Sequence, residues 1–287
     1  MTESRVRMMI DRRAHLALSF GRRDRPGVTV KPHSGAPIPV ARDVLIRPAM
    51  ELTKTIQDLP SSAAGYFGSM SESYDSLIHR AVPRYDEMIA RLLDYLPREP
   101  QRVLELGCGT GNLSLQLAKS FPLAELTLVD ASAEMITLVR SRMDESTPAS
   151  NPRVSYVEAR FEDLDLPAHS FDLVVSSISL HHVEDKAALY ARIRSLMTTG
   201  GRFCFADQIR GEPDSNHALN WERWLDFCRE SGHCTTEEID SLLQHAAAHD
   251  HYTTLTEHGA LLNNARFSEI DCVWRNWMWG IVTATAM

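Results

Sequence analysis

Residues 103–121 read VLELGCGTGNLSLQLAKSF, a stretch in which three glycines alternate with other residues. Gly107, Gly109 and Gly111 come directly after an apolar run and directly before a pattern with helical periodicity. Because glycine has no Cβ atom, such a loop can turn tightly and bring its backbone close to a ligand. The start of the next helix would offer unpaired backbone N–H groups at the same place. The stretch therefore predicts a strand, a ligand-binding loop and a helix.

Strands and helices alternate on the C-terminal side of this loop. Apolar runs predict strands at residues 102–107, 125–130, 154–159, 171–179 and 202–208. Helical patterns lie between them at residues 111–121, 132–143 and 185–197, the second starting at an N-cap-like Ser132 and the third ending at Gly200-Gly201. This alternation predicts an α/β fold with a doubly wound sheet.

The rhythm changes after Asp207. Two successive helices are predicted at 216–231 and 235–249, within a segment of about 209–252 that we interpret as a helical lid over the strand ends. A further helix at 254–265 and strands at 267–274 and 277–286 complete the chain. Upstream, residues 71–96 carry a helical pattern with a break near Pro83.

Charge separates the chain into two parts. Residues 1–49 hold ten of the 30 basic and four of the 38 acidic residues, so the remainder has 20 basic against 34 acidic residues, a net charge of −14. We expect the basic, Pro- and Gly-containing residues 1–49 to be a disordered extension and residues 50–287 to form the domain. An acidic domain disfavours nucleic acid as a partner. Five scattered cysteines and no long apolar run predict a cytoplasmic protein without a membrane span.

The glycine loop resembles a known motif. A dinucleotide fingerprint would need glycine where Asn112 stands, whereas G-x-G-x-G preceded by Glu105 resembles motif I of class I S-adenosylmethionine (SAM) methyltransferases. FDLVVSSISLHHV (171–183) resembles the fourth-strand motif of that family, and LMTTGGRFCFAD (196–207) resembles its Gly-Gly turn and fifth strand. The resemblance spans residues 102–208 and implies a Rossmann-like, mostly parallel sheet with an antiparallel last strand. A fold relative that binds a nicotinamide cofactor is the alternative.

The resemblance implies a set of SAM-binding residues. The loop from Gly107 to Gly111 would flank the methionine and ribose parts, and Asp130, which ends the second strand, would hold the ribose hydroxyls. Relatives often carry an aspartate for the adenine amino group where this chain has Arg160, which offers no acceptor, so Glu162 or Asp163 is the candidate. The full implied set is Glu105, Gly107, Gly109, Gly111, Asp130, Ala131, Met135, Phe161, Glu162, Ser177, Tyr74 and Arg80.

The remaining candidates would close over the cofactor or contact the acceptor. Tyr74, Arg80 and Tyr85 resemble residues that close over SAM, with Arg80 either pairing with the SAM carboxylate or lying solvated on a helix. His181 and His182 follow the fourth strand, where one could act as general base or orient the acceptor, unless the pair is only a loop feature. In the lid, the candidate substrate residues are Trp221, Trp224 and Arg229. The two tryptophans could instead pack the lid onto the sheet.

The end of the second lid helix has the spacing of a metal site. His245 and His249 are spaced by four residues, with Asp250 and His251 next to them, and this spacing can chelate a divalent ion. No third ligand stands at fixed helical spacing, and methyl transfer does not require a metal. The sequence therefore predicts a solvated helix end and no metal.

The predicted function is SAM-dependent methyl transfer to a small-molecule acceptor. One alternative is a carboxy-SAM synthase-like enzyme, because LIHRAVPRYDEMI (77–89) and DFCRESGHCTTEEI (226–239) resemble segments of that family and Arg229 stands at its carboxylate-binding place. The other is a SAM-binding protein without turnover. The sequence specifies neither the acceptor nor the oligomeric state.

Overall fold

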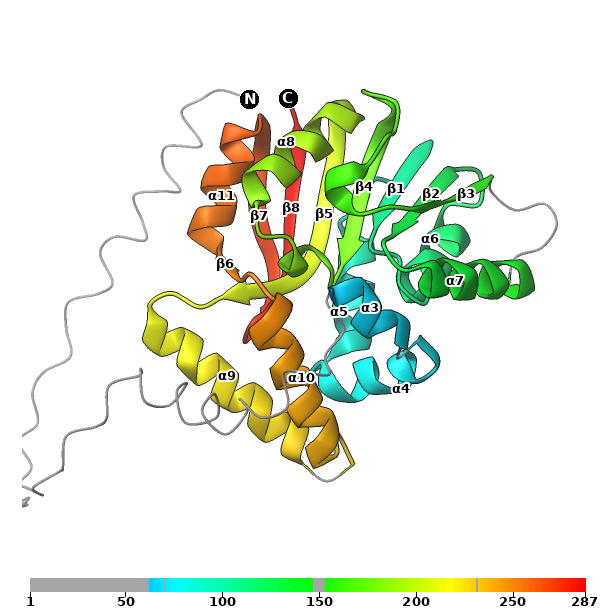
Figure 1. Cartoon of the computed structure of the whole chain (residues 1–287). Helices are drawn as coiled ribbons and strands as arrows, with labels where there is room; N and C mark the ends of the chain where they lie inside the picture. Colours follow the sequence, from blue (N-terminus) through cyan, green and yellow to red (C-terminus); the bar gives the residue numbers. More distant parts are fainter. Residues whose placement is uncertain (1–61, 70, 147–152, 231) are drawn as a thin grey trace, which may run out of the picture. The chain divides into compact units, whose positions relative to one another are not determined.

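The computed structural model describes residues 62–69, 71–146, 153–230 and 232–287, so the extension predicted for residues 1–49 lies outside the described residues. Within these ranges eight strands form one sheet with the order β3-β2-β1-β4-β5-β8-β7, and β6 pairs with β5 beside this path (Figure 1). The strands are β1 (Arg102–Leu106), β2 (Glu125–Asp130), β3 (Val154–Glu158), β4 (Phe171–Ser177), β5 (Met197–Arg210), β6 (Thr253–Thr254), β7 (Phe267–Asn276) and β8 (Trp279–Ala286).

The chain reverses its direction across the sheet between β1 and β4. From β1 it runs outward through β2 and β3, and after β4 it runs the other way through β5. The pairs β1–β2, β1–β4, β2–β3 and β4–β5 are parallel, whereas β8 is antiparallel to both β5 and β7. This confirms the doubly wound, mostly parallel sheet with an antiparallel last strand. In such sheets ligands bind at the carboxyl ends of the strands near the reversal.

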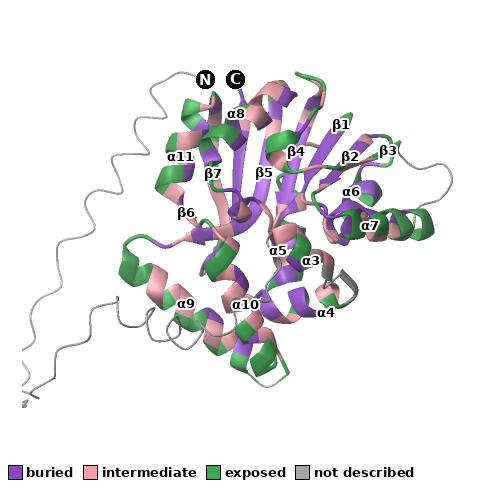
Figure 2. Ribbon diagram, in the orientation of Figure 1, coloured by how far each residue is buried: buried purple, intermediate pink, exposed green. Residues whose placement is uncertain are grey.

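Helices cover both faces of the sheet because side chains alternate between the faces along each strand. Val103 and Leu173 face a cluster that includes α5 (Tyr85–Asp94), α6 (Asn112–Ser120) and α7 (Ala133–Ser146). Leu104 and Val174, one residue further on, face α8 (Lys186–Leu196) and α11 (Leu255–Asn264). Figure 2 shows the central strands as buried between these two layers. This burial on both faces explains why β4 is apolar along most of its length.

A group of helices gathers at one end of the strands, below the sheet in the view of Figure 1. They are α3 (Ala63–Ser69), α4 (Ser71–Ala81), α9 (Asp214–Arg229) and α10 (Thr236–His249) (Figure 1). The expected break near Pro83 separates α4 from α5, and the Thr235–Glu238 capping box predicted at the start of α10 is present. No described helix is both long enough and apolar enough to span a bilayer.

One helix end differs from its prediction. The pair Gly200-Gly201 was expected to end the helix, but α8 already ends at Leu196 and β5 starts at Met197. The glycines instead lie where the register between β4 and β5 shifts after Phe171. They provide the backbone freedom for an irregularity in the strand rather than for a helix cap.

Candidate functional site

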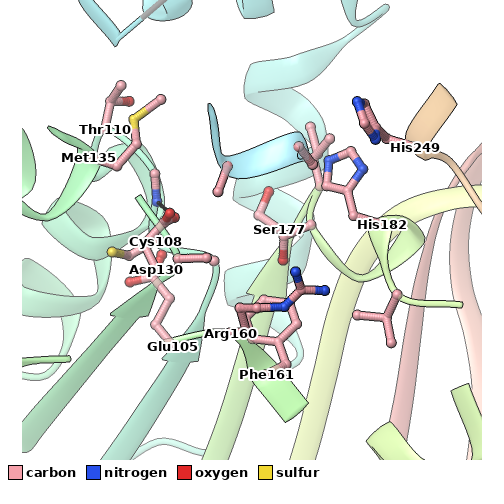
Figure 3. Close-up of a pocket in the computed structure, with 18 of the residues that line it drawn as sticks. Glu105, Cys108, Thr110, Asp130, Met135, Arg160, Phe161, Ser177, His182 and His249 are labelled. Carbon is pink, nitrogen blue, oxygen red and sulfur yellow. Dashed lines mark hydrogen bonds between the residues drawn. The ribbon is translucent and has the colours of Figure 1, made fainter. Parts of the chain in front are cut away.

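A cavity of about 470 Å³ opens at the carboxyl ends of β1, β2 and β4, where the chain reverses direction. This volume is within the usual range of small-molecule pockets. Figure 3 shows Glu105, Cys108 and Asp130 at one end of the cavity and His182 and His249 at the other. The cavity is thus elongated, with the glycine loop at one end and a histidine-containing segment at the other.

The glycine loop forms one wall of the cavity. Gly107 has a φ of +69°, and a Cβ atom there would lie 2.4 Å from the side chain of Ser179, so both conformation and space require glycine. Gly109 has a φ of +52°, and a Cβ atom added there would meet no other atom within 4 Å. The Gly109 backbone is therefore open to the cavity, and its contact with a cofactor stays a prediction.

Asp130 lies at the end of β2 with its carboxylate held in a fixed orientation. The backbone N–H of Gly109 donates to Oδ2 at 2.8 Å, and that of Ser132 donates to Oδ1 at 2.9 Å. Each carboxylate oxygen keeps a further lone pair that can accept from a hydroxyl. Burial raises the pKa of Asp130, and the two backbone N–H groups partly offset that effect. The arrangement is suited to binding a pair of neighbouring hydroxyls.

Behind the loop, Glu105 is completely buried. Ser114 Oγ donates to its Oε2 at 2.6 Å. Burial raises the pKa of Glu105 to about 8, and the nearby Asp130 adds to this effect. Glu105 is therefore largely protonated at neutral pH.

Helix α4 is connected to the glycine loop by Asp75, which sequence reasoning did not identify. Its Oδ1 accepts from the hydroxyl of Thr110 and, at 3.0 Å, from Asn112 Nδ2. Its Oδ2 accepts from Arg142 at 2.6 Å, and the same guanidinium donates to the carbonyl of Thr110 at 2.8 Å. The signal that could have found Asp75 is its position directly after Tyr74, inside the segment that resembles a SAM-closing helix.

Most of the predicted cofactor residues lie around the cavity. Among the lining residues are Tyr74, Glu105, Gly107, Gly109, Asp130, Ala131, Met135, Phe161, Glu162 and Ser177. Gly111 does not line the cavity; it is the N-cap residue that precedes α6 and has a φ of +94°. Arg160 and Glu162 both line the cavity, whereas Asp163 does not line it. The hydroxyl of Ser177 is buried and has no hydrogen-bond partner among the described residues, which leaves it available to a ligand.

Four predicted residues are placed away from the cavity. Arg80 forms a bidentate pair with Glu238 at 2.7 and 2.8 Å and also donates to the carbonyl of His233, so its donors are used to connect α4 to α10. Trp224 is buried, and its Nε1 donates to the carbonyl of Ala81 at 2.8 Å. This is the lid-packing role that was the alternative for the tryptophan pair.

The other two residues are on α9, within the segment that the sequence predicted as a lid. Trp221 packs edge-to-face on Trp224, and its Nε1 donates to His217 at 3.2 Å. Arg229 is mostly exposed and lies 3.5 Å from Asp226 on the same helix. Neither lines the cavity, so the structure does not bring these substrate candidates to the site.

The two histidines after β4 have different environments. His181 is buried, and its Nδ1 lies 2.5 Å from Asp207, a residue that ends the run FCFAD in β5 and that sequence reasoning did not identify. His182 lines the cavity with 15% of its side chain exposed. Burial, and then the neighbouring His181, lower the pKa of His182 to about 4, so its imidazole is neutral at neutral pH. Of the pair, only His182 lines the cavity and can contact a molecule there.

The end of α10 is not the solvated helix end that was predicted. His245 is buried, stacks on Tyr66 with 4.3 Å between ring centroids and lies 3.6 Å from Asp250. The sequence spacing could not show this, because the residues that enclose His245 come from α3 and from the segment after β4. His249 lines the cavity, as does His182.

Comparisons with known proteins give a consistent result. The family model of a methyltransferase domain matches residues 103–201. An uncharacterized methyltransferase of Bacillus mycoides is 30% identical over 159 residues, which cover 53% of this chain and 69% of that protein. An uncharacterized methyltransferase of Mycobacterium bovis is 31% identical over 132 residues, which cover 46% of this chain and 59% of that protein. The chain thus spans about three fifths of some of the curated relatives that it matches.

A solved structure has the same fold. Phosphoethanolamine N-methyltransferase 2 of Haemonchus contortus, in complex with SAM, superposes with a TM-score of 0.57 at 17% identity. The match covers 78% of this chain and 58% of that chain. At this identity the match supports the fold alone.

Proposed function

Since the chain belongs to the class I SAM-dependent methyltransferase family, we propose that it transfers the methyl group of SAM to a small-molecule acceptor. The observation that carries the proposal is the cavity itself, which starts at the glycine loop and Asp130 and extends to His182 and His249. One end has the groups for the cofactor, and the other end has room and polar side chains for an acceptor.

In this proposal the cofactor provides the reactive group. The sulfonium methyl of SAM is already an electrophile, so the protein has to orient the acceptor and exclude water. Positioning of two reactants can lower a barrier by about 7–11 kcal/mol. Asp130 would accept hydrogen bonds from the ribose hydroxyls, and the Gly107–Gly111 loop would approach the rest of the cofactor. His182, a histidine that lines the far end of the cavity, would contact the acceptor.

The cofactor half of the proposal is tested by calorimetry. We expect wild-type protein to bind SAM with a stoichiometry of one, and Asp130→Ala to weaken binding about 10–100-fold, because hydrogen bonds to a charged carboxylate contribute about 1.5–3 kcal/mol. Asp144→Ala, which removes an exposed carboxylate on α7, is the matched control and should bind like wild type. Equal affinities for all three proteins would contradict the assignment of Asp130.

The transfer half is tested with methyl-labelled SAM and a panel of oxygen, nitrogen and carbon acceptors. Label in an acceptor would support methyl transfer, and tight SAM binding without labelling of any acceptor would favour the SAM-binding protein without turnover. Native mass spectrometry of the purified protein identifies the sulfonium that it carries, and carboxy-SAM in place of SAM would favour the synthase-like alternative.

A cytoplasmic location is part of the proposal and agrees with five free cysteines.

A further inference from the structure

Three histidines surround a single carboxylate oxygen next to the acceptor end of the cavity. Asp250 Oδ1 lies 3.0 Å from His182 Nδ1, 3.7 Å from His181 Nε2 and 3.6 Å from His245 Nε2. The four side chains come from three places: the turn η4 (Leu180–His182), the last part of α10 and the residue that follows α10. Each of the four has at most 15% of its side chain exposed.

Two of these three distances are longer than a hydrogen bond. Heavy-atom separations of 3.6 and 3.7 Å, found for His245 and His181, are beyond the range in which a proton links nitrogen and oxygen effectively. A metal ion bonded to nitrogen and oxygen at about 2.0–2.2 Å with tetrahedral angles separates its ligands by roughly 3.3–3.5 Å. The observed distances of 3.0–3.7 Å lie around that value. Ligand atoms of His181, His182 and Asp250 also lie within 4.8 Å of one another.

The surrounding hydrogen bonds orient these groups toward one another. Asp207 accepts from the backbone N–H of His181 at 3.0 Å, and its other oxygen lies 2.5 Å from His181 Nδ1. A proton on Nδ1 leaves the lone pair on Nε2, which is the atom nearer to Asp250. Tyr252 donates to Asp250 Oδ2 at 2.5 Å and leaves Oδ1 for the histidines. A carboxylate behind a histidine and a hydrogen-bonded carboxylate ligand are the usual supports of a metal centre.

The segments that carry the histidines and Asp250 are connected by their backbones. The N–H of His251 donates to the carbonyl of His181 at 2.7 Å, and buried Lys186 donates to the carbonyls of Val183 and His251. These hydrogen bonds hold the histidine nitrogens and the carboxylate oxygen in place without a bound ion.

We propose that His181 Nε2, His182 Nδ1 and Asp250 Oδ1, with His245 Nε2 as fourth ligand, bind one divalent first-row transition metal ion. Imidazole nitrogens combined with a carboxylate suit zinc, cobalt, nickel or iron, whereas magnesium and calcium prefer oxygen ligands. The sequence-based argument against a metal required a third ligand on the same helix, and the fold brings the missing ligands from η4. The site goes beyond the proposed function, because metal binding is independent of SAM. Since His182 also lines the cavity, the ion would lie beside the acceptor.

The test uses the full chain without SAM. Protein treated with a chelator is titrated with Co²⁺ and with Zn²⁺, and binding is followed by calorimetry and by the visible spectrum of Co²⁺. We expect one equivalent to bind, with ligand-field bands but no cobalt–thiolate charge-transfer band. Asp250→Asn and His182→Gln should lose this equivalent. Asp207→Asn, which removes the charge behind His181, should weaken metal binding about 10–100-fold.

The matched control is an exposed histidine–carboxylate pair. His79 Nδ1 lies 3.1 Å from Asp86, so His79→Gln removes the same chemistry at the surface and should leave metal binding unchanged. Absence of saturable binding by wild type, a thiolate band, or retained binding in both Asp250→Asn and His182→Gln would overturn the proposal. SAM affinity is measured on the same samples, so a failure of the metal site can be distinguished from a failure of the proposed function.

Discussion

Gly109 is the residue at which the cofactor proposal is most sharply tested. We expect Gly109→Ala to lower SAM affinity at least about tenfold, since its methyl group would project into the open cavity beside the backbone that the ligand approaches. The left-handed conformation adds a stability cost of about 1–2 kcal/mol for a residue with Cβ. Gly200→Ala is the matched control, because Gly200 has a φ of +81° and equally free space outside the cavity. Calorimetry should show lost SAM affinity only for Gly109→Ala, and similar losses in both variants would contradict the prediction.

Glu105 should make the unliganded protein less stable as pH rises. Its pKa increases from 4.5 to about 8 on folding, because burial disfavours the charged form. Below about pH 4.5 both states are protonated; between about 4.5 and 8 only the unfolded state loses the proton, so the free energy of unfolding falls. Above about pH 8 both states are ionised and the effect is constant. Glu105→Gln removes this contribution, so its melting temperature relative to wild type should rise across that window. A pH-independent difference would contradict the assigned pKa.

Individual site residues could be predicted from the sequence where they directly follow the end of a strand. Asp130 and His182 were predicted for the cavity because parallel strands present their carboxyl ends at one edge, and both line it. Arg80 could not be assigned in this way. Its partner Glu238 is 158 residues away, and no local pattern indicates that α4 meets α10.

At the scale of elements, α4 and the glycine loop should act as one unit. We expect Asp75→Asn to lower both the melting temperature and SAM affinity, because Arg142 loses its charged partner and the loop loses its connection to α4. The loss of affinity should be about threefold to tenfold, since no group that we assign to the cofactor is removed. The control is Asp94→Asn, which breaks an exposed pair with Arg91 on α5. Calorimetry in which Asp75→Asn binds SAM like the control would show that the connection is unimportant.

The contact between α4 and α10 should stabilise the lid without affecting SAM. Arg80 and Glu238 are each about 30% exposed, so we expect Arg80→Met to cost about 1 kcal/mol of stability. SAM affinity measured by calorimetry should stay within about threefold of wild type, because the guanidinium does not line the cavity. A tenfold loss of SAM affinity in a folded Arg80→Met variant would instead support the sequence hypothesis that Arg80 binds the SAM carboxylate.

The elements themselves were predicted more closely than their arrangement. Strand β2 was predicted with its observed bounds, and α9 and α10 were each predicted within two residues, because apolar periodicity and caps are local signals. The burial of His245 under Tyr66 depends on how α3 packs against α10. Such packing is decided by side chains far apart in sequence, so helical spacing alone predicted a solvated end.

At the scale of the whole molecule, we expect the glycine loop, the sheet and the helices α9 and α10 to unfold as one cooperative unit, so SAM should stabilise all of it. At a SAM concentration of about 100 times Kd, linkage adds about 2.7 kcal/mol to the free energy of unfolding. For a domain of this size each kcal/mol raises the melting temperature by about 2–4 °C, so we expect an increase of about 5–10 °C. Asp130→Ala at the same SAM concentration, with an affinity about 10–100-fold lower, should gain only about 0.4–1.4 kcal/mol and thus about 1–6 °C, whereas Gly200→Ala should show the full increase. An increase confined to a separate, lower transition in calorimetry would show that the SAM site unfolds independently of the sheet.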